Sequence, residues 1–156
     1  MKKKYYILLI IGLCLFDQLS KLIILKFFDV NESLVLIKNF LKIYYIQNIG
    51  ISFGIFSGMR IPIIVLSILI IGYMIYEFIK SEKRVSLISI SLIISGAFGN
   101  LIDRVFRGYV VDFISFTLFK KEMSIFNLAD TFITIGVFIY IISLFMEGKY
   151  ERVNSK

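Results

Sequence analysis

Four long runs of hydrophobic residues alternate with more polar segments along the chain. The runs cover residues 5–28, 61–79, 85–102 and 125–146. Each is close to the roughly 20 residues that cross a bilayer as a helix. The whole chain is 58% hydrophobic, whereas soluble domains contain about 45–50% apolar residues. The pattern predicts a mainly α-helical integral membrane protein, a bundle of four transmembrane helices in a single domain over residues 1–156.

The segments between runs one and two and between runs three and four, residues 29–60 and 103–124, are long. The first contains LKIYYIQ, whose Tyr and Ile content favours a strand, and then NIGISFGIFSG, which is too rich in Gly for a long helix. We expect a small extracytoplasmic β-sheet on the outer membrane surface, followed by Pro62 in the first turn of the second helix. The second segment is expected to form a loop or helix at the same interface.

Lysine and arginine are dense at the opposite ends of the runs. These residues are Lys2, Lys3, Lys4, Lys80, Lys83, Arg84, Lys149, Arg152 and Lys156. Short cytoplasmic segments carry such an excess, so both termini are predicted to be cytoplasmic and the two long segments to face outward. The formal net charge of +7 is then an attraction to anionic lipid head groups rather than to nucleic acid.

The basic start and the sequence LIIGLC also suggest a cleaved lipoprotein signal ending before Cys14. Two details argue against cleavage. Leu13 is bulky where a small residue is needed, and the charged Asp17 and Lys21 stand where a mature chain would begin. We therefore expect the first run to remain as a transmembrane helix.

The residue types that are missing narrow the chemistry. The chain has no histidine, which excludes Ser-His-Asp and Cys-His nucleophile systems and the HExxH zinc site. Its one cysteine, Cys14, excludes a cluster of cysteine ligands and an intrachain disulfide. A Ser-Lys pair is formally possible, but Ser20 and Lys21 are neighbours and point to different sides of a helix. Carboxylate side chains are therefore the remaining candidates for catalysis.

Acids, amides and one lysine are spaced for shared helix faces near the outer ends of the runs. The pairs are Asp17 with Lys21, Asn100 with Asp103, and Asn127 with Asp130. Each pair can turn one polar face toward the interior of the bundle. A simple ion pair at the end of a span explains the first pair equally well, and ordinary interface charges explain Asp103 and Arg104.

Asp112 and Asp130 are harder to explain as surface charges. They lie in the apolar stretches GYVVDFISF and IFNLADTFI, without an adjacent basic residue. Burying a carboxylate costs several kcal/mol unless it is paired or protonated. Ionisable groups in such membrane segments are candidates for function.

Four blocks of the sequence resemble a known family in order and spacing. The blocks are FDQLSK at 16–21, NIGISFGIF at 48–56, GNLIDRVFRGYVVDFI at 99–114 and FNLAD at 126–130. They closely resemble the motifs of bacterial lipoprotein signal peptidase, or signal peptidase II, and the resemblance covers essentially the whole chain. It implies a membrane aspartic endopeptidase that removes the signal peptide from prolipoproteins by cutting on the N-terminal side of the diacylglyceryl-cysteine.

The resemblance also implies roles for individual residues. The aspartates of the VVDFI and N-x-A-D blocks form the catalytic dyad of the family, which corresponds to Asp112 and Asp130. The matching supporting positions are Asp17, Lys21, Asn48, Gly50, Asn100, Asp103, Arg104, Asn127 and Ala129. Two departures are visible: Ile51 and Ser52 replace a common pair of alanines, and Ser124 replaces a common proline.

The implied reaction uses no metal and no cofactor. The implied substrates are diacylglyceryl-modified prolipoproteins, and the implied protein is a monomer among membrane lipids that binds no nucleic acid. Its expected location is the bacterial cell membrane, with the active site near the outer face.

Three other functions stay open at this point. A proton or ion transporter would place acids near the middle of the bilayer, often with repeat symmetry, and neither feature is visible. A magnesium-dependent lipid transferase would use carboxylates as ligands, and removal of the metal would reveal it. A non-enzymatic assembly helper explains none of the acids.

Overall fold

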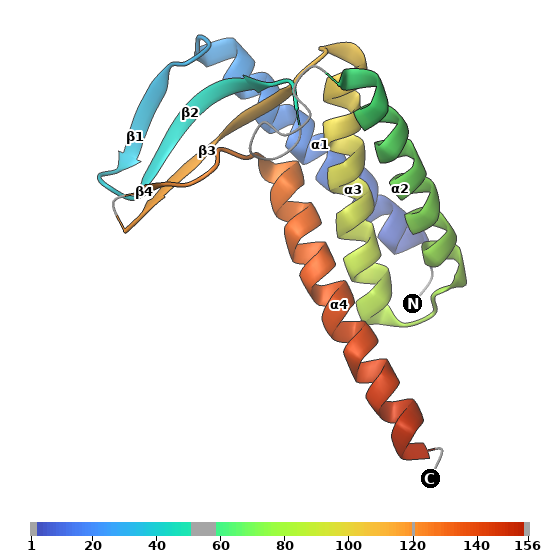
Figure 1. Ribbon diagram of the computed structural model, residues 1–156. Helices are drawn as coiled ribbons and strands as arrows, with labels where there is room; N and C mark the ends of the chain where they lie inside the picture. Colours follow the sequence, from blue (N-terminus) through green and yellow to red (C-terminus); the bar gives the residue numbers. More distant parts are fainter. Residues whose placement is uncertain (1–2, 51–58, 120, 155–156) are drawn as a thin grey trace.

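The computed structural model describes residues 3–50, 59–119 and 121–154. These residues form four helices: α1 (Lys4–Phe27), α2 (Arg60–Lys80), α3 (Arg84–Phe106) and α4 (Leu128–Asn154). They also form the strands β1 (Ser33–Ile37), β2 (Leu41–Asn48), β3 (Val110–Leu118) and β4 (Lys121–Glu122). The strands make one antiparallel sheet in the order β1-β2-β3-β4, at one end of the helical bundle (Figure 1). The predicted membrane bundle with a small sheet is confirmed.

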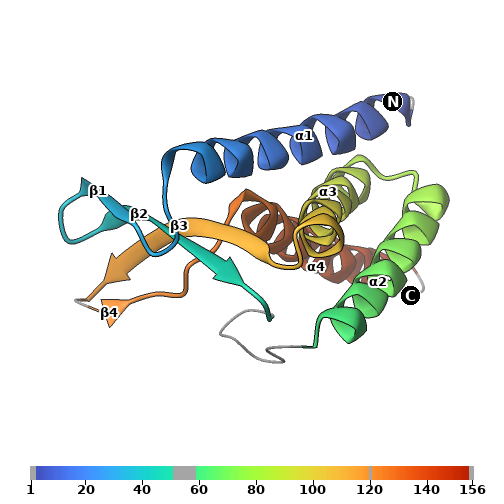
Figure 2. The ribbon, with the colours of Figure 1, turned by 90° about the horizontal axis from the view of Figure 1, so that it is seen from above.

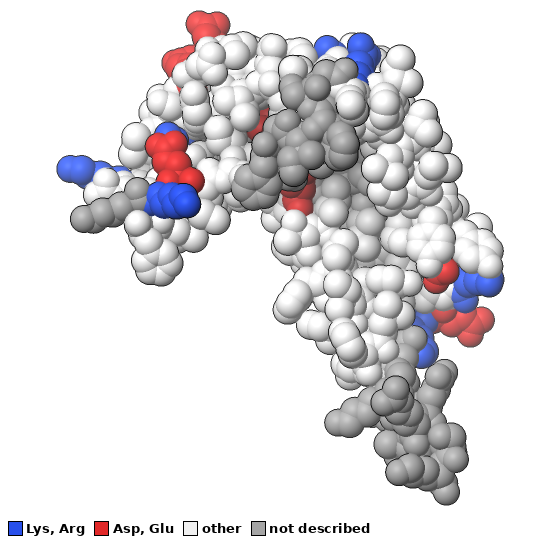
Figure 3. All heavy atoms as spheres, viewed as in Figure 1, with Lys and Arg blue, Asp and Glu red and all other residues white. Residues whose placement is uncertain are grey.

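All four helices are long and apolar enough to cross a membrane. Their most hydrophobic 18-residue windows have mean hydropathies between 2.0 and 2.2, and in α4 the apolar part covers Leu128–Met146. Charged side chains gather over the sheet and near the opposite end of the bundle, and a broad uncharged band lies between them (Figure 3). This distribution is the one that a bilayer requires of a spanning protein.

Helix α3 is the central helix of the bundle. In its apolar window 61% of the residues are buried, against 17–22% in the other helices. Glycines bring α3 and α4 together: a Cβ at Gly96 would meet the backbone oxygen of Ala129, and one at Gly136 would lie 2.8 Å from the backbone oxygen of Ser89. Small residues permit this close approach of helix backbones in a membrane, and the approach brings the start of α4 beside α3.

The sheet joins the two long segments between the hydrophobic runs. In the register between β2 and β3, Ile46 lies opposite Asp112 and Asn48 lies opposite Val110. Viewed from above, the sheet extends to one side of the bundle, and α1 runs along one side of the other helices (Figure 2). Val111 and Phe113 pack with Ile24 of α1 and with Tyr45 of β2. Because side chains alternate along a strand, Asp112 points to the opposite face of the sheet.

The second long segment, residues 103–124, differs from the expected loop or helix. It supplies β3 and β4, because its β-branched and aromatic residues pair with the equally β-prone LKIYYIQ segment. Helix α3 also extends past the expected residue 102 to Phe106, so Asp103 and Arg104 are helical rather than part of a loop. The run predicted over 85–102 stops at its first charge, but the helix continues because Asp103 is buried inside the protein.

The remaining boundaries need smaller adjustments. Helices α1 and α2 agree with the predicted runs to within one residue, and Pro62 lies in the first turn of α2 as expected. Helix α4 begins at Leu128 rather than at residue 125, because Phe126 forms a bridge with Ile114 of β3. It ends at Asn154 rather than at 146. The expectations for residues 51–58, including Ile51 and Ser52, lie outside the described residues.

Candidate active site

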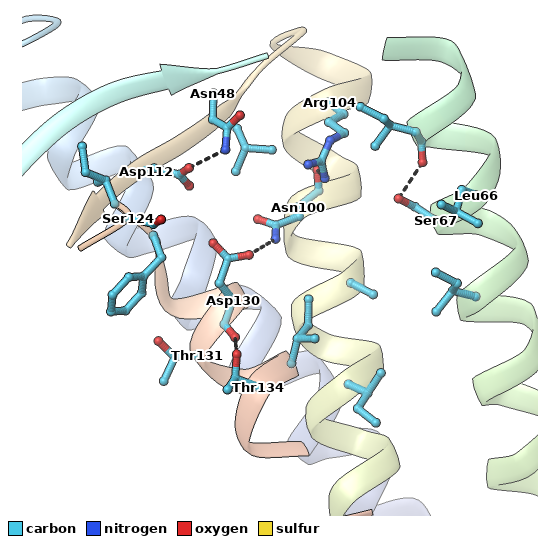
Figure 4. A pocket seen from close by; sticks show the side chains of 18 of the residues that line it. Asn48, Leu66, Ser67, Asn100, Arg104, Asp112, Ser124, Asp130, Thr131 and Thr134 are labelled. Carbon is cyan, nitrogen blue, oxygen red and sulfur yellow. Dashed lines mark hydrogen bonds between the residues drawn. The ribbon is translucent and has the colours of Figure 1, made fainter. Parts of the chain in front are cut away.

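Asp112 and Asp130 come from different elements but line one cavity. The cavity has a volume of about 690 Å³ and lies between α2, α3, α4 and the sheet. Asp112 is on β3 and only 1% exposed, and Asp130 is half-buried in the first turn of α4. Figure 4 shows the two carboxyl groups directed toward the same space. The structure thus brings together two acids that are eighteen positions apart in the sequence.

Two side-chain amides hold the carboxyl group of Asp112. Asn48, the last residue of β2, donates from Nδ2 to Oδ2 at 2.8 Å. Asn127 donates from Nδ2 to Oδ1 at 2.6 Å. Both oxygens of Asp112 are therefore oriented by neutral donors rather than by a direct cation.

Asp130 is positioned by the start of its own helix and by α3. The side chain of Asn127 accepts a hydrogen bond from the backbone N–H of Asp130 at 2.9 Å, and the carboxylate of Asp130 accepts one from the N–H of Asn127 at 3.3 Å. This reciprocal pair is a capping box, which explains the spacing of three between the two residues. Asn100 donates from Nδ2 to the other oxygen of Asp130 at 2.8 Å.

The amides also link the two acids to each other. Asn127 donates from Nδ2 to Oδ1 of Asn100 at 3.1 Å, while the same Nδ2 donates to Asp112. The chain of contacts therefore runs from Asp112 through Asn127 and Asn100 to Asp130. The hydrogen-bond partners of Asn100 and Asn127 allow only one placement of oxygen and nitrogen in each amide. The two amides therefore hold the two carboxyl groups in one arrangement.

Burial and the neighbouring acid raise the pKa of Asp112 to about 7. Burial is the larger cause, because it disfavours the charged carboxylate, and the negative charge of Asp130 adds to it. The hydrogen bonds from Asn48 and Asn127 and the charge of Lys21 act in the opposite direction without cancelling the shift. Asp112 can therefore gain and lose a proton near neutral pH, as a catalytic acid and base must.

Lys21 is the buried centre of the supporting network. Its Nζ lies 2.8 Å from Asp17 and 2.9 Å from Asp103, and all three side chains are fully buried. It also donates to Oδ1 of Asn100 at 3.1 Å. The pair of Asp17 and Lys21 is therefore interior to the protein and is not an ion pair at the lipid surface.

The two buried carboxylates hold the residues that precede the two site acids. Oδ1 of Asp17 accepts from the backbone N–H of Ala129 at 3.0 Å, and Oδ2 of Asp103 accepts from that of Val111 at 3.2 Å. Ala129 is followed by Asp130 and Val111 by Asp112. Because Lys21 pairs with both carboxylates, it couples the anchor of α4 to the anchor of β3.

Arg104 and Gly50 are in contact beside the end of β2. Arg104 donates to the backbone oxygen of Gly50 at 3.0 Å and, more weakly, to that of Asn100 at 3.5 Å. The N–H of Gly50 donates to Oδ1 of Asn48 at 2.9 Å, which completes the orientation of that amide. Arg104 also lines the cavity, as does Ser124, the residue that replaces the expected proline. Arg104 is thus part of the site and not only an interface charge.

Several contributing residues were not selected from the sequence. Gln18 donates to the backbone oxygen of Gly99 at 3.0 Å, and Arg107 pairs with Asp103. Arg60 of α2 donates to the backbone oxygens of Arg104 and Val105 at the end of α3, at 2.8 and 2.9 Å. Arg107 stands four residues after Asp103, a detectable helical spacing, whereas nothing in the sequence connects Arg60 with α3.

The described part of the chain contains no group of three or more His, Cys, Asp and Glu side chains placed to hold a metal ion. Cys14 is half-buried in α1 and has a free thiol. The polar groups that line the cavity include the carboxyls of Asp112 and Asp130, two amides and the guanidinium of Arg104, a set that suits general acid and base chemistry on a bound water.

Comparison with known proteins gives a consistent result. The sequence profile described as "Signal peptidase (SPase) II" matches residues 9–146. A lipoprotein signal peptidase of Fusobacterium nucleatum is 38% identical over 95% of this chain and 90% of its own length, and one of Clostridium tetani is 40% identical over 93% and 94%. One of Staphylococcus aureus is 39% identical over 97% of both chains.

Two solved structures share the fold. Both are described as bacterial membrane enzymes. One has a TM-score of 0.88 and 37% identity, covering 93% of this chain and 90% of the other; the second has a TM-score of 0.83 and 38% identity, covering 90% and 92%. With a match over most of its length in profile, in relatives and in structure, this chain belongs to the signal peptidase II family.

Proposed function

We propose that Asp112 and Asp130 are the catalytic dyad of this membrane aspartic peptidase, which removes signal peptides from prolipoproteins. The observation that carries the proposal is the convergence of the two acids on one cavity, where amides orient both of them. The raised pKa of Asp112, about 7, adds that the pair can hold one proton near neutral pH.

In the proposed reaction, a water molecule lies between the two carboxyl groups. The ionised carboxylate takes a proton from the water, and the oxygen of that water attacks the scissile carbonyl carbon. At the same time the protonated acid donates its proton to the carbonyl oxygen. The resulting gem-diol collapses when one hydroxyl returns its proton to the dyad and the leaving nitrogen gains one. The enzyme ends with one shared proton, as it began, and no covalent intermediate is needed.

The walls of the cavity suit a substrate that arrives from the membrane. On α2 the cavity is lined by Ile63, Leu66 and Ile70, and on α4 by Ile133 and Ile135. Figure 4 shows Leu66 on α2, apart from Asp112 on β3 and Asp130 on α4. A signal helix can therefore pack against apolar side chains while its outer end reaches the dyad. We infer that the cut bond is the one on the N-terminal side of a diacylglyceryl-cysteine, whose acyl chains stay in lipid.

We further propose that both termini are cytoplasmic and that the site faces outward, within one membrane domain and one monomer. The start of α1 and the last turns of α4 lie at the end of the bundle away from the sheet (Figure 1). Lys80 at the end of α2, Lys83 in the short link and Arg84 at the start of α3 lie at that same end. The concentration of basic residues there supports a cytoplasmic position.

Because the chain belongs to the signal peptidase II family, a peptidase explains its acids better than a transporter, a metal-dependent transferase or an assembly helper does. The contacts agree with this choice. Asp17 and Asp103 both pair with Lys21, Asp103 also pairs with Arg107, and the two acids are not spread along a pathway across the membrane.

The test is cleavage of a purified lipidated prolipoprotein by the purified protein in bilayers, with mass spectrometry of both products. The proposal expects one cut, directly before the lipidated cysteine. A cut at another bond, or an intact precursor, would contradict it. The Asp29→Asn variant is a matched control for substitutions in the dyad, because Asp29 is an exposed aspartate outside the site.

A further inference from the structure

Asp103 is a buried carboxylate with partners on both of its oxygens. Oδ2 accepts from Lys21 at 2.9 Å and from the backbone N–H of Val111 at 3.2 Å. Oδ1 accepts from the guanidinium of Arg107 and, at 3.3 Å, from Nε2 of Gln18. Arg107 also donates to Oε1 of Gln18 at 3.1 Å. Arg107 and Gln18 therefore contact each other as well as Oδ1 of Asp103.

The position of Asp103 also defines the turn that leads to Asp112. The backbone oxygen of Asp103 accepts from the N–H groups of Arg107 at 2.8 Å and of Gly108 at 3.1 Å, which ends α3. Gly108 has a φ of +87°, a left-handed value that glycine adopts without strain, and the chain reverses there into β3. With its backbone and its side chain, Asp103 thus fixes both ends of the segment between α3 and Val111.

The charges of the network require a second cation. Asp17 and Asp103 are two fully buried carboxylates, and Lys21 supplies only one positive charge between them. Arg107, whose side chain is 20% exposed, supplies the other. A buried carboxylate that loses a partner is strongly disfavoured, so it moves toward water or takes up a proton. Either response would weaken the hydrogen bond from Val111.

We propose that Arg107, braced by Gln18, is a positioning residue for Asp112. It holds the carboxylate of Asp103 in the orientation from which the second oxygen anchors the N–H of Val111, and so sets the place of the next residue, Asp112. The inference rests on the proposed catalytic role of Asp112. Arg107 acts through Asp103 and not on the reacting atoms, and small displacements of reacting groups have large effects on rate.

The experiment compares Arg107→Met, which keeps the length of the side chain but removes its charge, with Arg107→Lys. Arg84→Met is the matched control, because Arg84 is an exposed arginine at the other end of α3. We expect Arg107→Met to lower kcat by about 10-fold to 100-fold. KM should stay within about twofold of the parent value, since the cavity walls are unchanged. Arg107→Lys should recover most of the lost kcat, and Arg84→Met should match the parent.

A second variant and a spectroscopic readout separate positioning from folding. Gln18→Ala keeps every charge and should lower kcat less than Arg107→Met does. In protein with isotope-labelled valine, hydrogen exchange at the Val111 amide should be faster in Arg107→Met than in the parent. Thermal unfolding of each variant shows that the protein being measured is folded.

The parent enzyme, assayed alongside, distinguishes the two possible failures. An inactive parent contradicts the proposed function. An active parent with unchanged kcat in folded Arg107→Met and in Gln18→Ala, or with unchanged exchange at Val111, overturns the positioning role. Equal losses in kcat for Arg107→Met and Arg84→Met would overturn it as well, because the effect would then follow any lost arginine.

Discussion

The carboxylate of Asp17 in α1 accepts a hydrogen bond from the backbone N–H of Ala129 at the start of α4, at 3.0 Å and across 112 residues of sequence. The first turn of a helix has free N–H groups, so a carboxylate from another helix can satisfy one of them. This contact fixes the start of α4 on α1, one residue before Asp130. The site therefore depends on α1, which carries neither of the two proposed catalytic acids.

Gly99 provides the space for that contact. A Cβ at position 99 would collide with the carboxylate of Asp17 and would lie 3.3 Å from the Cβ of Ala129. Asp17 cannot yield freely, because Oδ2 is paired with Lys21 and Oδ1 with Ala129. We expect Gly99→Ala to lower the free energy of unfolding by about 1–3 kcal/mol and to reduce activity.

Gly72→Ala in α2 is the control for this substitution. A Cβ at Gly72 has no atom within 4 Å, so the added methyl group meets open space. Alanine also favours helix over glycine, and we expect unchanged or slightly higher stability. Denaturant titration in the same detergent measures both variants. Equal stability of Gly99→Ala and Gly72→Ala would show that the space beside Asp17 is not needed.

The raised pKa of Asp112 predicts the basic side of the pH profile. Above pH about 7 the dyad loses its shared proton, so kcat should fall as the pH rises through that value. Asn48 lowers the pKa of Asp112 by hydrogen bonding, and Asn48→Ala should therefore move this fall to higher pH. A profile that is flat between pH about 6 and 9 would contradict the assignment.

The same shift affects stability. Between its ordinary pKa, about 4, and its value in the fold, about 7, Asp112 takes up a proton on folding. The free energy of unfolding contributed by this group should therefore fall as the pH rises through that interval, and the full cost of burying the charge is present above it. Unfolding of Asp112→Asn should lack this component.

Activity should survive excess EDTA and excess thiol-alkylating reagent. The proposed step uses two carboxyl groups and a water, and Cys14 lies on α1 outside the cavity lining. Assays with and without each reagent, on the same lipidated precursor, check this. Loss of turnover with EDTA that magnesium restores would favour metal-dependent chemistry instead.

Recognition of the substrate should depend on its lipid. Each buried methylene contributes about 0.8 kcal/mol, so two acyl chains hold the cysteine at a fixed depth in the bilayer. Without them the signal helix stays in the membrane, but the scissile bond is no longer held beside the dyad. The unlipidated precursor, reconstituted in the same bilayers, should be cut far more slowly and at no other bond. Equal rates for the two precursors would show that peptide sequence alone directs cleavage.

The sequence was sufficient for the spans because continuous apolar runs of that length have few alternatives. It was insufficient for β3, since the pattern of residues 110–118 does not reveal that its partner is β2, more than sixty positions earlier. The hydrophobic run ends at residue 102, because the charged Asp103 follows, so the sequence places the end of α3 too early. Only the fold shows that Lys21 and Arg107 neutralise Asp103.

The site, too, is predictable from the sequence only in part. Asp112 and Asp130 stood out because isolated acids in apolar stretches need an explanation, and the family motif named them. The i, i+4 spacing of Asp103 and Arg107 is visible in the sequence, but the contact of both residues with Gln18 is not, because α1 and the end of α3 meet only in the folded bundle. The spacing of Asn127 and Asp130 predicts a shared helix face, but the structure shows that it forms a capping box.

The most direct measurement is the rate at which Asp112→Asn and Asp130→Asn cut a lipidated prolipoprotein in bilayers, beside the parent and the Asp29→Asn control. Asparagine keeps the shape of the side chain but removes the ionisable carboxyl group that acts as acid or base, so each dyad variant should lose at least about 100-fold in kcat. Thermal unfolding should show that both variants are folded, and the control should cleave like the parent. Substantial cleavage by either folded dyad variant would contradict the central claim that these two aspartates carry the reaction.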